Sequence, residues 1–244
     1  MALVDLVCFH HAGGGSTSFH SLRRALADVG ADVALQVATL PGRESRRAEP
    51  RHVDADSCVQ ALADELEERL TRPHVLLGHS MGALLAYSLS QQRISRGLRP
   101  PEAVIVASCR APHQPAPTEN LQSMDDYRLA VQLARYGGLP TEILDRPDWL
   151  ALLMPIVRDD LRIFQSFQRS DEPPLPCPLY IFGGCDDPLA PPDTLAAWQT
   201  HSLLPHPVRL YHGGHFLFRS PDPALVTAIA RIAVDATFQG SGIS

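Results

Sequence analysis

The stretch His74-Val75-Leu76-Leu77-Gly78-His79-Ser80-Met81-Gly82-Ala83-Leu84-Leu85-Ala86 decides the fold. Its first apolar residues, Val75 to Leu77, predict a short strand buried on both faces. The small and apolar residues after Gly82 predict a helix packed closely on a sheet. A Gly-His-Ser-Met-Gly turn joins the two, and a serine in such a turn has a strained backbone and a hydroxyl above the sheet. The pattern predicts Ser80 as a nucleophile; a glycine-rich turn without chemistry is the alternative.

The length and composition of the chain suit one α/β domain. Of its 244 residues, 45% are hydrophobic, which is enough for a large core. The sequence has no apolar run long enough to predict a transmembrane helix, and the N-terminus lacks the pattern of a signal peptide. The net charge of −6 argues against nucleic acid as the main partner. Five scattered cysteines without a C-x-x-C pair indicate reduced thiols in a cytoplasmic protein and no zinc or redox centre.

Strand and helix patterns alternate along the rest of the chain. Besides the strand before Ser80, apolar runs predict strands at 5–10, 33–40, 103–107, 179–182 and 208–211. Helical spacing of apolar residues occurs between them, at 19–29, 59–70, 83–97, 191–198 and 223–232. This alternation predicts a mostly parallel sheet flanked by helices.

Two groups of prolines interrupt the alternation and border an insertion at about 112–176. Within it, helical patterns occur around 124–135, 143–153 and 156–169. We predict a helical lid over the carboxyl edge of the sheet, which Gly137-Gly138 would make mobile; ordinary crossover helices are the alternative. The chain is therefore expected to form a single domain, 1–244, with this insertion.

A serine nucleophile needs a histidine as its base and a carboxylate that orients the histidine. In a sheet of this kind the three residues follow the order Ser, acid, His, each just after a strand. Asp186 and Asp187 follow the strand that ends at 182. We favour Asp187 because Pro188 restricts the turn directly after it, and similar hydrolases carry the acid in an Asp-Pro pair. Asp186 remains the alternative.

The candidate bases follow the last strand. His212 and His215 both lie there, in the segment His-Gly-Gly-His-Phe. We favour His215 because Gly213-Gly214 provides a loop that can bend back over the serine, whereas His212 is expected at the strand end. The predicted catalytic residues are therefore Ser80, Asp187 and His215.

An acyl-transfer site also needs two N–H donors for the oxyanion. Met81 supplies one as the residue after the nucleophile, and the loop after the first strand is expected to supply the other. Ala12 precedes Gly13-Gly14-Gly15 in that loop and is the predicted second donor. A phosphate-binding loop is the alternative, but the segment lacks the Gly-Lys-Ser/Thr ending that such loops carry.

Several motifs together resemble the type II thioesterases, which are free-standing α/β-hydrolases that accompany polyketide synthases and non-ribosomal peptide synthetases. The matching segments cover nearly the whole chain: Phe9–Gly14, Leu40–Arg43, Gly78–Gly82, Leu153–Asp160 and Gly214–Phe216. One departure is His10, where the family usually has proline, and it affects the loop that carries Ala12. The resemblance implies an α/β-hydrolase fold with a helical lid insertion.

The resemblance also implies a substrate and a role. The substrate is an acyl group in thioester linkage to the phosphopantetheine arm of an acyl or peptidyl carrier protein, and the role is to clear aberrant acyl units. No metal or organic cofactor is needed, and no membrane or nucleic acid is involved. Because carrier proteins are usually acidic, Arg43, Arg46, Arg47 and Arg51 are candidates for docking; a solvated arginine-rich loop is the alternative. A small-molecule carboxylesterase or lipase, and a carrier-binding module without turnover, remain the alternatives.

Overall fold

A parallel sheet forms the centre of the computed structural model, which describes residues 4–115, 121–167 and 172–239. The strand order is β2-β1-β3-β4-β5-β6, and β7 pairs with the last part of β5. Each pairing between these strands is parallel, which confirms the predicted sheet type. The strands are β1 (Val4–Phe9), β2 (Val33–Val37), β3 (His74–His79), β4 (Ala103–Ala107), β5 (Leu175–Gly184), β6 (Ser202–Pro205) and β7 (Arg209–Tyr211).

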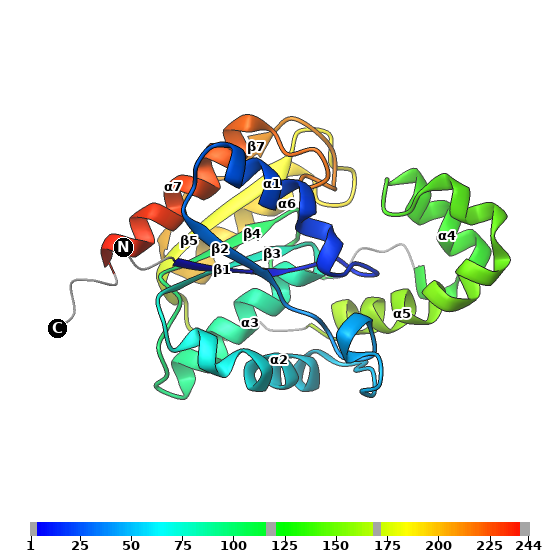
Figure 1. The fold of residues 1–244 in the computed structure, drawn as a ribbon, viewed down its shortest axis with the longest axis horizontal. Coiled ribbons are helices and arrows are strands. Elements are labelled where there is room, and N and C mark those ends of the chain that lie inside the picture. Colours follow the sequence, from blue (N-terminus) through cyan, green and yellow to red (C-terminus); the bar gives the residue numbers. More distant parts are fainter. Residues whose placement is uncertain (1–3, 116–120, 168–171, 240–244) are drawn as a thin grey trace.

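Helices cover both faces of the sheet, with α2 and α3 on one side and α1 and α7 on the other (Figure 1). The α-helices are α1 (His20–Asp28), α2 (Ala55–Leu70), α3 (Met81–Ser95), α4 (Asp126–Arg135), α5 (Pro147–Ser166), α6 (Pro192–Leu195) and α7 (Pro223–Gln239). Short 3-10 segments lie at Ser16–Phe19, Glu44–Arg46, Leu121–Ser123, Thr141–Asp145 and Ala196–His201. In the described part of the chain, no helix has both the length and the hydrophobicity needed to cross a membrane.

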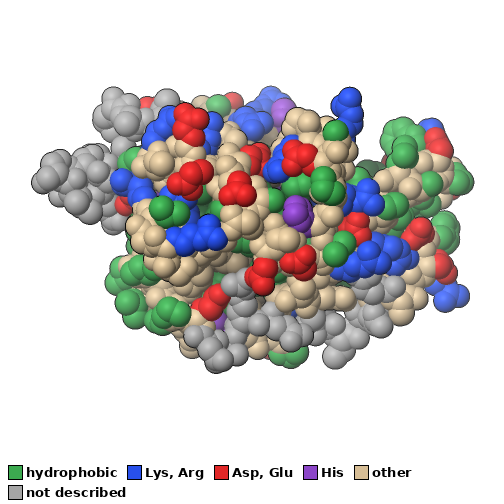
Figure 2. Space-filling model, turned by 90° about the horizontal axis from the view of Figure 1, so that it is seen from below, with side chains coloured by type: hydrophobic (Ala, Val, Ile, Leu, Met, Phe, Trp, Pro, Cys, Tyr) green, Lys and Arg blue, Asp and Glu red, His purple; other side chains and the backbone are tan. Residues whose placement is uncertain are grey.

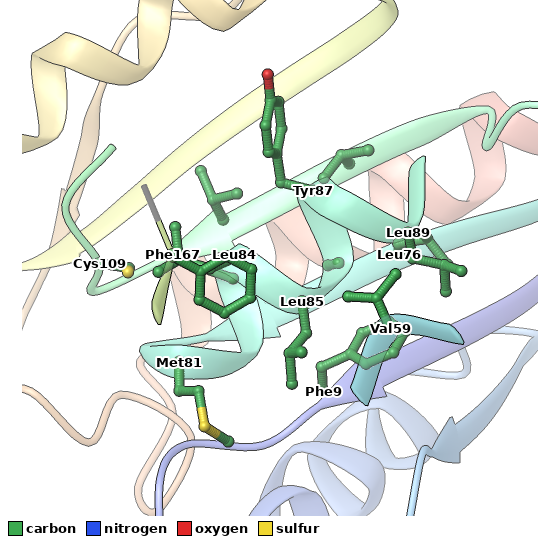
Figure 3. Packing of buried hydrophobic residues seen from close by; sticks show 14 of the residues in the cluster. Phe9, Val59, Leu76, Met81, Leu84, Leu85, Tyr87, Leu89, Cys109 and Phe167 are labelled. Carbon is green, nitrogen blue, oxygen red and sulfur yellow. The ribbon is translucent and has the colours of Figure 1, made fainter. Parts of the chain in front are cut away.

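The hydrophobic core on the α2 and α3 side is the larger of the two beside the sheet. Phe9 and Leu76 of the sheet pack there with Val59 of α2 and with Leu84 and Leu85 of α3 (Figure 3). On the opposite side, residues of α1 and α7 pack on the other face of the same strands. Because both faces are covered, the central strands are buried throughout and read as continuous apolar runs.

β5 begins earlier than expected, because the sequence analysis assigned the prolines before residue 179 to the border of the insertion. Leu175, Cys177 and Leu179 are buried and alternate with the less buried Pro176 and Pro178, which is the period of a strand. Proline cannot donate to the strand ladder, and the pairing of β5 with β6 shifts register between residues 175 and 178. The prolines therefore lie at an irregularity of the sheet. The short strand β6 was not predicted.

Helices α4 and α5 occupy the predicted insertion between β4 and β5 and extend beyond the sheet on one side of the molecule (Figure 1). The two helical patterns expected around 143–153 and 156–169 are wrong as separate helices, because α5 runs continuously through Pro155. Leu150, Met154, Val157 and Leu161 form one buried stripe along it. Packing of this stripe holds the helix together across the proline. Residues 116–120 and 168–171 of the predicted insertion lie outside the described ranges.

The parallel register brings the carboxyl ends of five strands to one edge. Phe9 of β1 pairs with Gly78, His79 of β3 pairs with Ala107, and Gly184 of β5 pairs with Tyr211 of β7. The segments that follow β1, β3, β5 and β7 therefore begin next to one another. Each of the residues predicted to carry chemistry lies in one of these four segments.

We expect Gly82→Ala to lower the free energy of unfolding far more than Gly97→Ala. A Cβ at Gly82 would lie 2.1 Å from the backbone oxygen of Phe9, and backbone atoms there cannot move aside cheaply. Gly97 has open space around it and only a positive φ of 66°. The expected losses are about 3 kcal/mol or more at Gly82 and about 1 kcal/mol at Gly97. Urea denaturation measures both, and equal losses would contradict the packing argument.

Candidate active site

Ser80 lies in a sharp turn between β3 and α3 and has a left-handed backbone, with φ 55° and ψ −121°. Its N–H donates to the carbonyl oxygen of Ala107 over 2.9 Å, which attaches the turn to β4. A Cβ on Gly78 would meet the backbone oxygen of Gly82 at 2.2 Å, so the two glycines allow the turn to close. A non-glycine residue in this region is strained and persists only where its surroundings hold it.

Asp187 and His215 form a buried hydrogen-bonded pair. The Nδ1 of His215 lies 2.9 Å from Oδ2 and 3.1 Å from Oδ1 of Asp187. The carboxylate also accepts hydrogen bonds from the N–H groups of Leu189 and Ala190, at 2.8 and 3.1 Å. Burial raises the pKa of Asp187, but the hydrogen bond and attraction from His215, with the two N–H donors, outweigh it and hold the pKa below its ordinary value. The carboxylate therefore stays ionised and accepts a hydrogen bond from Nδ1–H of His215. The proton stays on Nδ1, and Nε2 is the nitrogen that can act as a base.

The alternatives to these two residues lie elsewhere. Asp186 is exposed, and its backbone N–H donates to the carbonyl of Gly213 over 3.0 Å. His212 is also exposed, and its N–H points to Asp222 over 3.3 Å. Of the four candidates, only Asp187 and His215 bring a carboxylate and an imidazole together.

His79 links the loop 212–219 after β7, here called the histidine loop, to the turn that carries Ser80. It precedes Ser80, its Nε2 donates to the carbonyl oxygen of His215 over 2.7 Å, and the two rings lie 5.3 Å apart. His215 is therefore held beside the turn that carries Ser80. Among the described residues, the Ser80 hydroxyl makes no hydrogen bond, so Asp187 and His215 are the two predicted triad residues that touch. Catalytic hydrogen bonds commonly tighten only when substrate is bound.

Two further histidines form an uncharged wall beside this pair. Burial, followed by repulsion from His215, lowers the pKa of His79 to about 3. The pKa of His11 is also well below its ordinary value, because of burial and then of repulsion from His79. Their rings lie 5.2 Å apart, edge to face, and His11 meets Phe216 at 4.9 Å. His79 was not considered in the sequence analysis, and His11 was set aside as a histidine at a strand end; the signal of both is position, directly before Ser80 and Ala12.

The loop after β1 lies against the first turn of α3. A Cβ on Gly82 would meet the backbone oxygens of both Phe9 and His10. Met81 is the first residue of α3, and the N–H groups of a first turn have no partner within the helix. Ala12 packs between the main core and the cluster around α5. The two residues predicted as oxyanion donors therefore lie in neighbouring segments at the same edge.

A cavity of about 820 Å³ opens beside these segments. Leu152, Leu153 and Ile156 of α5 give it an apolar wall, and His11, His79 and Phe216 line it as well. Its size falls in the range of small-molecule sites. Among the described residues, no group of three or more histidine, cysteine or acidic side chains is arranged to hold a metal.

The segment after α4 is attached to the histidine loop. The Arg219 guanidinium donates to the carbonyl oxygens of Gly137 and Gly138, the latter over 2.8 Å, and lies 4.8 Å from the centre of the Phe216 ring. A Cβ on Gly138 would lie 3.0 Å from the Phe216 ring. The glycine pair that was predicted to give mobility thus contacts the far wall of the cavity.

The arginines considered for docking have different surroundings. Arg43 is buried and pairs with Asp160, so it is not available to a partner protein, and that part of the docking expectation is wrong. Arg46 pairs with Glu49 and Glu65. Arg51 pairs with Asp159, and Arg47 is exposed and lines the cavity. On the face in Figure 2, acidic and basic side chains lie interspersed.

Comparison with known proteins shows the family. The thioesterase domain family matches residues 4–235. A probable cadicidin biosynthesis thioesterase of Streptomyces griseus is 31% identical over 93% of this chain, which spans 62% of that relative's length. The solved thioesterase RedJ, from the prodiginine pathway of Streptomyces coelicolor, is 31% identical with a TM-score of 0.86, over 94% of this chain and 90% of that chain. YbtT, a type II thioesterase from the yersiniabactin NRPS/PKS pathway, is 28% identical with a TM-score of 0.86, over 96% and 94%.

We expect Asp187→Asn to slow the reaction of Ser80 with a fluorophosphonate by a factor on the order of 10³–10⁴, because the amide favours the wrong tautomer of His215. Asp186→Asn is the matched control and should react within about twofold of the wild-type rate. Labelling time courses followed by intact mass measure both rates. If the two variants exchange these outcomes, Asp186 is the acid.

We also expect His79 to make the fold sensitive to acid. The unfolded chain takes up a proton at this histidine near pH 6.5, whereas the folded chain resists protonation until about pH 3. The contribution of His79 to the free energy of unfolding is therefore complete above pH 6.5. It is lost as the pH falls toward 3, by about 1.4 kcal/mol per pH unit for one proton. His79→Gln, which keeps an N–H donor, should remove that part of the slope.

Urea denaturation at several pH values between 7.5 and 4.5 tests this expectation. His20→Gln, at an exposed position of α1, is the control and should keep the wild-type slope. A His79→Gln slope equal to that of the wild type would show that His79 is not the group that resists protonation.

Proposed function

The chain belongs to the thioesterase family, and from that membership we propose that it hydrolyses acyl thioesters held on the phosphopantetheine arm of a carrier protein. In this role it clears aberrant acyl units in polyketide or non-ribosomal peptide biosynthesis. The observation that carries the proposal is the buried Asp187–His215 pair, which is held beside the strained turn of Ser80. His79 and Phe216, the sequence neighbours of Ser80 and His215, line the 820 Å³ cavity.

The proposed reaction begins when the Ser80 hydroxyl attacks the thioester carbonyl. Nε2 of His215 takes the hydroxyl proton, and Asp187 stabilises the imidazolium that forms. The oxyanion accepts hydrogen bonds from the N–H groups of Met81 and Ala12. When the intermediate collapses, the carbon–sulfur bond breaks, and the thiol leaves with the proton from His215. The acyl group remains as an ester on Ser80.

Water then completes the cycle. His215 removes a proton from a water molecule, which attacks the acyl-Ser80 carbonyl, and the same oxyanion donors stabilise the second tetrahedral intermediate. The serine oxygen leaves and regains its proton from His215, so the free acid and the original enzyme are the products. Each proton moves between the substrate, water and His215, and the scheme uses no metal or organic cofactor.

The walls of the cavity suit the proposed substrate. The apolar side chains of α5 offer a surface for an acyl chain, and the neutral rings of His11 and His79 add no charge to it. We place the reaction in the cytoplasm and assign the insertion at about 112–176 as a lid of a single domain. The contacts of Arg219 with Gly137 and Gly138 support a lid that meets the histidine loop. Of the four arginines of the loop 43–51, Arg47 is the one that is exposed and lines the cavity, and we assign it to contact with an acidic carrier.

We expect Ser80→Ala to lose hydrolysis of acyl-loaded carrier protein by a factor of about 10⁴ or more while it keeps the fold. Ser88→Ala, at a buried serine of α3, is the matched control and should retain most of the activity. Intact-mass analysis of a panel of acyl-loaded carrier proteins follows the loss of the acyl group directly.

The same panel, extended to acyl-CoA and p-nitrophenyl esters, separates the proposal from its rivals. A strong preference for simple oxyesters would identify a carboxylesterase or lipase. Carrier binding with no turnover by the wild-type protein would identify a binding module. Unchanged turnover by Ser80→Ala would remove Ser80 from the mechanism.

A further inference from the structure

We propose that Asp160 of α5 is a positioning residue for the loop after β1, and that it holds the oxyanion donor Ala12 in place from the helical insertion. The inference rests on the proposed function, because it assigns a role within the same acyl-transfer site. It goes further by placing a requirement for catalysis on a helix that carries none of the triad residues.

Asp160 is fully buried and its carboxylate has three donors. The N–H of Gly13 donates to Oδ2 over 2.7 Å, and the two Nη atoms of Arg43 donate to Oδ2 and Oδ1 over 2.8 and 2.5 Å. Arg43 is itself buried, and its Nη1 also donates to the carbonyl oxygen of Gly14 over 3.0 Å. The ion pair thus holds the backbone of the loop at two successive residues, by the N–H of one and the carbonyl of the next.

The backbone that this pair holds is a β-turn. The N–H of Gly14 donates to the carbonyl oxygen of His11 over 2.9 Å, which makes Ala12 and Gly13 the two central residues. Gly13 has a φ of 76°, and Ala12 is not among the residues with positive φ. Of the common turn types, only type II combines a negative φ at the first central residue with a positive φ at the second.

The hydrogen bond from Gly13 to Asp160 acts on the part of this turn that can change. Type I and type II turns differ by a flip of the central peptide, which here joins the carbonyl of Ala12 to the N–H of Gly13. Asp160 accepts from that N–H and therefore favours one of the two orientations. The N–H of Ala12 belongs to the preceding peptide, so Asp160 acts on it by holding the whole turn, and with it the position of Ala12, against α5.

A second contact from the same face of α5 supports the first. A Cβ on Gly13 would lie 2.8 Å from Cγ2 of Val157, which is one turn before Asp160 on the helix. The helix therefore contacts the turn through the side chain of Val157 and accepts a hydrogen bond from it through Asp160. The Arg43–Asp160 ion pair joins three segments: the loop 11–15, the segment 40–43 and α5. The two residues of the pair are 117 positions apart in the sequence.

The test compares Asp160→Asn with Asp159→Asn. Asp159 is the adjacent residue of α5, and it pairs with Arg51 and Arg162 instead of with the β1 loop. We expect Asp160→Asn to lower kcat for acyl-carrier hydrolysis about 10- to 100-fold with little change in KM, since a displaced oxyanion donor weakens only the transition state. Asp159→Asn should stay within about twofold of the wild type in both constants.

A boronic acid supplies a readout that a purely structural role would not move. It forms a tetrahedral adduct with a nucleophilic serine and places an oxygen where the oxyanion would lie. We expect its inhibition constant for Asp160→Asn to rise by the same factor by which kcat falls. An unchanged inhibition constant and kcat in Asp160→Asn would overturn the proposal.

The double variant Arg43→Met/Asp160→Leu separates positioning from folding. Replacing a buried ion pair by apolar side chains is often neutral for stability, so we expect a urea midpoint near that of the wild type. The turn would still lack its acceptor, and kcat should remain low. Recovery of kcat together with stability would overturn the proposal. If the wild-type protein neither binds the boronic acid nor hydrolyses acyl-carriers, the proposed function fails instead, and that outcome is distinct from both.

Discussion

The close contact between the first turn of α3 and the end of β1 is the constraint on which the site depends. Gly82 lies against the backbone oxygens of Phe9 and His10 so closely that no side chain fits between them. This contact places the loop after β1 beside the N-terminus of α3, and it requires the sharp turn in which Ser80 is strained. Two segments that are about seventy residues apart in sequence thereby form one continuous surface at the sheet edge.

The electrostatics of the site follow from burial around that surface. His11 and His79 are kept neutral because burial, followed by repulsion from a neighbouring histidine, lowers the pKa of each ring. His215 differs from them because its Nδ1 is hydrogen-bonded to the buried carboxylate of Asp187. One imidazole of the cluster is therefore equipped to hold a positive charge, and its neighbours provide hydrogen bonds and apolar contact without competing for the proton. The neighbours thus favour a single proton acceptor.

Much of this arrangement could be predicted from sequence because its signals are local. The turn at Ser80 carries its own glycines, and Pro188 directly after Asp187 favours this residue over Asp186 as the partner of His215. Features that depend on distant partners could not be predicted in this way. Arg43 was expected at a docking surface because its neighbours in sequence are charged, and only the fold shows that it is buried against Asp160. The alternation in the first part of β5 was hidden by its prolines, and the continuity of α5 through Pro155 depends on a buried stripe that only tertiary packing reveals.

The position of α5 has a consequence for specificity under the proposed function. Ester and thioester hydrolysis use the same triad, so selectivity must come from the walls around it. One face of α5 supplies the apolar wall of the cavity through Leu152, Leu153 and Ile156, and the next turns supply the contacts of Val157 and Asp160 with the β1 loop. A rigid helix cannot move at one of these places without moving at the other. Under the proposed function, a shift of α5 that reshapes the apolar wall would therefore also disturb the contacts that hold the turn of Ala12.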